Sequence, residues 1–162
     1  MTVYVIDDHP LMRDALTMLA LYALPFEAHK DLWDTLDVGY FMRHEAGDIA
    51  WHTRHVSRFI SDAQHKGTAA GTLVRARMSP WEEGLEVMVY VRDQPDLFAR
   101  ICGFFDRLNL NILDAKIHTT RHGYALDTFQ VMGAGTVEVI LTLNAPEDLP
   151  FAARDLPFPI EI

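Results

Sequence analysis

The sequence has 162 residues, of which 49% are apolar and 23% are charged, a composition typical of folded globular domains and not of disordered chains. Asp and Glu number 23 against 14 Lys and Arg, which gives a formal net charge of -9 at pH 7. So acidic a chain argues against binding to nucleic acid or to an anionic membrane surface. The one cysteine, Cys102, excludes an intrachain disulfide, and its apolar neighbours predict a buried, unreactive thiol.

The first region, residues 1–25, combines a short strand with one helix. Val3–Ile6 is an apolar run typical of a buried strand, and Asp8 with Pro10 favours a helix start that runs on to about Leu24. No basic segment precedes an apolar core, and the run Ala15–Phe26 is too short to cross a bilayer. We therefore expect a soluble cytoplasmic protein without membrane association.

The second region, residues 26–84, is predicted to be a helical arm followed by a linker. Apolar residues from Leu32 to Tyr40 recur at helical spacing and predict one amphipathic helix. Asp48 is placed to cap a second helix. Several glycines then indicate a linker, with a short strand at Leu73–Met78.

The third region, residues 85–162, predicts an α+β domain of antiparallel strands with helices on one face. A strand at Glu86–Val91 leads through the turn Asp93–Asp96 into the clearest amphipathic helix of the chain, from Leu97 to Leu108. Strands at Ile112–Thr120 and Tyr124–Met132 form a hairpin, in which Gly123 is expected to take a positive φ. A further strand, a short helix and a last strand are expected at Thr136–Leu143, Pro146–Asp155 and Phe158–Ile162.

Few residues of this sequence carry recognisable chemistry. The histidine pairs His52/His55 and His118/His122 lack a third ligand at motif spacing, so solvated or capping roles are favoured over zinc, and no metal or cofactor is predicted. Serine-hydrolase and phosphate-loop motifs are absent, and no catalytic residue is assigned.

The turn Asp93–Asp96 is the most informative candidate for a binding site. Backbone N–H groups at the start of the following helix can hold a carboxylate, and the two aspartates can hold an ammonium group. Such a pair of groups suits a free amino acid. The alternative is that Asp96 serves only as a helix cap.

Specific motifs give this chain a family resemblance. The runs DQPDLFARI, NILDAKIHTT and GYALDTFQV, all within Glu83–Met132, resemble the first ACT domain of the bifunctional PII uridylyltransferase/uridylyl-removing enzymes. The upstream run YFMRHEAGDIAWHTRHV is similar to the helical segment that precedes that domain. The resemblance implies a ferredoxin-like βαββαβ sheet and a role in nitrogen regulation. It also implies allosteric sensing of an amino acid, with glutamine as the expected ligand. It also implies a homodimer through ACT-like sheets.

The catalytic motifs of those enzymes are absent here, so the resemblance implies the sensor and leaves enzymatic activity of the chain alone unsupported. The ligand-binding region of that family maps onto two segments of this chain that are expected to face each other. The first is Asp93, Gln94, Pro95, Asp96 and Leu97, and the second is Asn111, Ile112, Leu113, Asp114 and Ala115. Residues 1–19 instead resemble the start of a response-regulator receiver domain. The alternatives are therefore a receiver remnant, or a hybrid or artificial α+β protein without a ligand.

Overall fold

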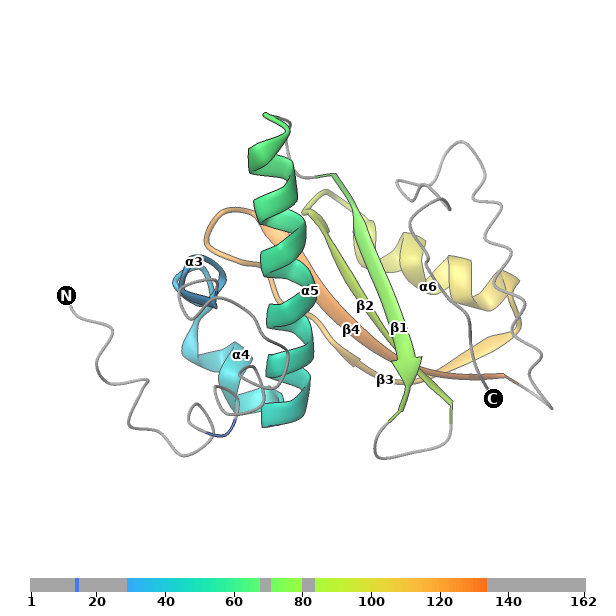
Figure 1. The fold of residues 1–162 in the computed structure, drawn as a ribbon. Helices are drawn as coiled ribbons and strands as arrows, with labels where there is room; N and C mark the ends of the chain where they lie inside the picture. The colour runs from blue at the N-terminus through green and yellow to red at the C-terminus, as the bar shows by residue number, and fades with distance from the viewer. Residues whose placement is uncertain (1–13, 15–28, 68–70, 80–83, 134–162) are drawn as a thin grey trace. The chain divides into compact units, whose positions relative to one another are not determined.

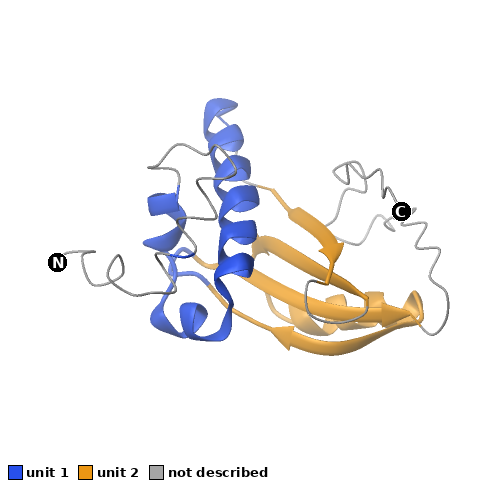
Figure 2. Cartoon of the chain, turned by 60° about the horizontal axis from the view of Figure 1, so that its bottom comes forward, with its two compact units in different colours: residues 1–70, 120–122 blue, residues 71–119, 123–162 orange. Residues whose placement is uncertain are grey.

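The computed structural model describes residue 14 and residues 29–67, 71–79 and 84–133, and the chain forms two compact units (Figures 1 and 2). Unit 1 comprises residues 1–70 and the turn 120–122, and unit 2 comprises residues 71–119 and 123–162. Apart from residue 14, the receiver-like elements expected in residues 1–25 lie outside the described residues. So do the strands and helix expected from Thr136 onward.

The described part of unit 1 contains three helices, α3 (Lys30–Trp33), α4 (Val38–Arg43) and α5 (Ala46–His65). The single helix expected from Leu32 to Tyr40 is wrong, because the chain turns between α3 and α4. Local hydrogen bonds cause this break: the Thr35 hydroxyl donates to the Leu32 carbonyl (2.6 Å), and the Asp37 carboxylate accepts from the Tyr40 N–H (3.1 Å). Asp37 thus caps α4, as short polar side chains commonly do.

Helix α5 also begins earlier than expected. Its N-cap is Glu45, and Asp48 lies in the first turn, where its carboxylate accepts a hydrogen bond from the Glu45 N–H (3.3 Å). Asp48 therefore stabilises the helix start from inside the helix, in a capping-box arrangement, and is not the cap itself.

The core of unit 1 is aromatic and contains buried polar groups. Trp33 donates its indole N–H to the Thr53 hydroxyl (2.8 Å), which joins α3 to α5. The Tyr40 hydroxyl lies 2.7 Å from His52 Nδ1, which joins α4 to α5. Tyr40 and His52 are both almost completely buried. Because buried polar groups are costly without partners, these hydrogen bonds fix how the helices pack.

The described residues of unit 2 form a four-stranded antiparallel sheet in the order β1-β2-β4-β3, with one helix on one face (Figure 1). The strands and helix are β1 (Leu73–Met78), β2 (Leu85–Arg92), α6 (Leu97–Arg107), β3 (Leu110–Lys116) and β4 (Tyr124–Gly133). The expected α+β class, the short strand in the linker and the β3–β4 hairpin are confirmed. The first strand of the hairpin differs from its expected range, Ile112–Thr120, because it begins at Leu110 and ends at Lys116. β1 lies at the sheet edge beside β2.

Helix α6 packs its apolar face on alternate residues of β2 and β4. Leu97, Ile101 and Phe105 recur every four residues and bury against the strands, whose inward residues are Val87, Val89, Val91, Ala125, Phe129 and Val131. Each such side chain contributes about 1.5–3 kcal/mol when it is fully buried.

Two glycines are required by the backbone of unit 2. Gly123, in the hairpin turn, has φ +74, as predicted. Gly84 has φ +103, and a Cβ atom built there would clash with the backbone carbonyl of Val131. The chain therefore passes close to β4 just before β2 begins, which only glycine allows.

Candidate functional site

The candidate site begins at the loop that connects β2 to α6. Asp93, Gln94, Pro95 and Asp96 are exposed, whereas Leu97 is buried under the helix. Asp93 is held on both sides: its N–H donates to the Gly123 carbonyl (2.9 Å), and its carboxylate accepts from the Thr119 hydroxyl (3.0 Å). The loop is therefore an exposed surface feature with a fixed first residue.

Asp96 has an unusual conformation for a residue at a helix start. Its φ of 61 and ψ of 11 place it in the left-handed region, and its side chain makes no capping hydrogen bond. Asp96 is thus the N-cap residue of α6 by position, but its side chain does not cap the helix. Its carboxylate remains at the surface beside the first turn of α6, where the helix dipole favours a negatively charged group.

A buried carboxyl near this loop, Asp127, was missed from the sequence. Asp127 is 1% exposed and lies in the same alternating set as Ala125 and Phe129, on the face of β4 that packs against α6. Burial raises the pKa of Asp127 to about 6; the His118 N–H (3.2 Å) opposes the shift, and the charge of Asp93 adds to it. The sequence does hold a sign of this burial, because Asp127 alternates with the apolar residues Ala125 and Phe129 along the strand.

The second predicted segment forms most of β3. Asn111, Leu113 and Asp114 are exposed, whereas Ile112 and Ala115 are half-buried. The pairing of β3 with β4 shifts by one residue between Ile112 and Asp114, which marks a β-bulge at Leu113.

Strand register separates the two predicted segments within one chain. Asp114 pairs with Gln130, which in turn pairs with Glu86 on β2. Glu86 precedes the end of β2, Arg92, by six residues, which corresponds to about 20 Å along the strand. The loop 93–96 and the segment 111–115 therefore lie toward opposite ends of the sheet.

One of the paired histidines, His52, differs from its predicted environment, whereas His122 is exposed as expected. His52 is fully buried and hydrogen-bonded to Tyr40, so the expected solvated or capping role is wrong for it. His44 is also buried, and its ring packs against Tyr40 at a centroid distance of 4.4 Å. Among the described residues, no group of three or more His, Cys, Asp or Glu is arranged to hold a metal ion.

Cys102 lies on α6 and is half-buried, less than predicted. It packs against the hydrophobic core between α6 and the sheet. Burial raises the pKa of its thiol, which lowers its reactivity.

The described residues define an α+β protein in which an antiparallel sheet, consistent with an ACT-like domain, follows a small helical unit. The family model described as the uridylyltransferase GlnD fifth domain matches residues 12–55. The chain is 56% identical over 149 residues to the bifunctional uridylyltransferase/uridylyl-removing enzyme of Ralstonia nicotianae, 88% of this chain. It is 54% identical over 117 residues to that of Burkholderia lata, 72% of this chain. The resemblance to this enzyme family is confirmed.

This chain spans only a small part of those relatives: 16% of the Ralstonia nicotianae enzyme and 13% of the Burkholderia lata enzyme. No solved structure matches it. Of the helices that the structure describes, none has the length and apolar character needed to cross a membrane.

Proposed function

We propose that this chain is a regulatory segment that binds a free amino acid at the loop Asp93–Leu97, and that this amino acid is glutamine. The proposal rests on Asp96, which lies at the exposed start of α6 in the left-handed conformation. Its side chain makes no capping hydrogen bond to the helix. It leaves a carboxylate beside backbone N–H groups, so an α-ammonium group and an α-carboxylate can bind at neighbouring positions.

The names of the relatives suggest the setting of this segment. Both enzymes are named for attaching and removing uridylyl groups. We propose that the segment acts in the cytoplasm as part of such an enzyme, where amino-acid binding biases the two activities in nitrogen regulation. Such allosteric control requires the ligand to have different affinities for two states of the protein.

We also propose that the chain forms a homodimer through its ACT-like sheet. Among the described strands, β3 pairs with β4 alone, which leaves its outer edge open to a further strand. If two β3 strands pair antiparallel about a two-fold axis at their midpoint, Asn111 of one chain lies beside Ala115 of the other, so the two 111–115 segments face each other across the dimer.

Binding is tested by thermal unfolding and calorimetry with L-glutamine. A ligand at 100 times its Kd stabilises the folded state by about 2.7 kcal/mol, so Tm should rise with glutamine. Asp96→Asn keeps a residue that tolerates the left-handed region but removes the charge, and it should abolish the rise. Asp106→Asn, an exposed substitution near the other end of α6, should not. No rise with millimolar glutamine, or an equal rise with every amino acid, refutes the glutamine assignment.

Dimerisation is tested by sedimentation equilibrium at micromolar concentration. Leu113→Lys places a charge on the open β3 edge and should weaken the dimer, because charged side chains on an edge strand disfavour pairing with another strand. Met78→Lys makes the same change on the exposed side of β1, at the other edge of the sheet, and should leave the dimer intact. A monomeric wild-type chain would contradict the proposed dimer.

A further inference from the structure

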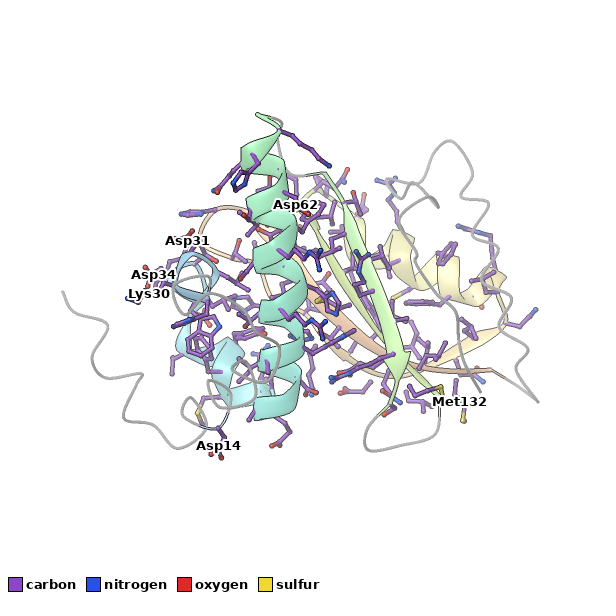
Figure 3. All side chains as sticks on the ribbon, in the orientation of Figure 1. Asp14, Lys30, Asp31, Asp34, Asp62 and Met132 are labelled. Carbon is purple, nitrogen blue, oxygen red and sulfur yellow. The ribbon has the colours of Figure 1, made fainter. Side chains whose placement is uncertain are left out.

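The turn between β3 and β4 is part of the helical unit, although the strands that it joins belong to the sheet. Residues 120–122 belong to unit 1, as the colouring of Figure 2 shows. The Arg121 N–H donates to the Thr35 carbonyl (2.8 Å), and Arg121 Nη1 donates to the Asp34 carbonyl (3.3 Å). Asp34, labelled in Figure 3, is the C-cap residue of α3. The turn thus contributes a backbone donor to the segment between α3 and α4.

The same turn is flanked by the two partners of Asp93. Thr119, immediately before it, donates its hydroxyl to the Asp93 carboxylate (3.0 Å), and Gly123, immediately after it, accepts from the Asp93 N–H (2.9 Å). Only the three residues of the turn separate these two attachment points. A displacement of Asp93 therefore acts on both ends of the turn at once.

We propose that this turn couples the state of the Asp93–Asp96 loop to the segment between α3 and α4. A ligand cation that binds the Asp93 carboxylate competes with the Thr119 hydroxyl, which frees one end of the turn and weakens the bond from Arg121 to Thr35. The effect is reciprocal, since loosening Arg121 must change the free energy of the loop by the same amount. As a route for an amino-acid signal the coupling rests on the function proposed above, whereas the mechanical link holds without any ligand.

The link is tested by hydrogen exchange of individual amides, measured by NMR on the full chain without ligand. Thr119→Val removes the hydroxyl donor at an exposed position, and Thr119→Ser retains it. In the valine variant the Arg121 amide should exchange about five-fold faster, the factor that corresponds to one lost hydrogen bond. The serine variant should match the wild type.

The amide of Phe129, at the centre of β4, reports global stability in the same spectra. Unchanged exchange at Arg121 in the valine variant overturns the proposal. Equal acceleration at Arg121 and Phe129 also overturns it, because the substitution then acts by global destabilisation.

Adding L-glutamine separates this proposal from the proposed function. In the wild type, bound glutamine should accelerate exchange at Arg121, and Thr119→Val should remove that response. If calorimetry shows no glutamine binding while Thr119→Val still accelerates Arg121, the ligand assignment fails and the link stands. If glutamine binds and leaves Arg121 unchanged, the turn does not carry the signal.

Discussion

Replacing Asp127 by asparagine should stabilise the protein at neutral pH. The buried carboxyl has a pKa of about 6, against its ordinary value of 3.8, so the folded state holds its proton more tightly than the unfolded state does. A difference of about two pKa units corresponds to about 3 kcal/mol. The protonated carboxyl therefore contributes this amount to the free energy of unfolding below pH 4, and the contribution is lost as the pH rises through 6.

The asparagine variant retains an oxygen that can accept from the His118 N–H but carries no charge. It should therefore match the wild type near pH 4 and exceed its free energy of unfolding by up to about 3 kcal/mol at pH 7.5. Urea unfolding followed by circular dichroism across this range measures the difference. Asp114→Asn, at an exposed position on β3, serves as the control and should not reproduce the pH dependence.

Two results would refute this reasoning. Parallel stability curves for the wild type and Asp127→Asn would show that the carboxyl carries no pH-dependent cost. An NMR titration of the Asp127 carboxyl carbon with a midpoint near 3.8 would show that burial does not disfavour its charge.

Four further substitutions test the backbone and the packing within each unit by chemical unfolding. Gly84→Ala should cost about 2–4 kcal/mol from its clash and positive φ. Gly103→Ala, on α6, where a Cβ would meet only the Arg107 side chain at an ordinary contact distance, should stabilise by about 0.5–1 kcal/mol; equal effects would contradict the backbone argument. Tyr40→Phe removes the buried bond to His52 and should cost about 1–3 kcal/mol, and a neutral result would show that this bond does not hold α4 to α5. Asp96→Gly should stabilise by about 0.5–1 kcal/mol, since no capping bond is lost; destabilisation would mean that Asp96 is not strained.

Elements with strong apolar periodicity could be predicted from the sequence. The helix α6 and the β3–β4 hairpin follow from the spacing of Leu97, Ile101 and Phe105 and from the need for glycine at position 123. The break between α3 and α4 could not, because the pattern of apolar residues continues across it. Local hydrogen bonds of Thr35 and Asp37 end one helix and begin the next.

The candidate site was less predictable because it depends on strand register. The exposed turn Asp93–Asp96 was visible as a turn, but its separation from Asn111–Ala115 follows from pairings between distant residues and from the bulge at Leu113. The environment of Asp127 also depends on the face that β4 presents to α6. A single sequence does not specify these long-range pairings.

The attachment of the β3–β4 turn has an evolutionary consequence. Hairpin turns at protein surfaces usually tolerate insertions and deletions, since few contacts depend on their length. Here Arg121 must reach the Thr35 carbonyl while Thr119 and Gly123 both stay at Asp93. Homologous chains that keep these bonds should therefore conserve the length of this turn more strictly than its amino-acid composition.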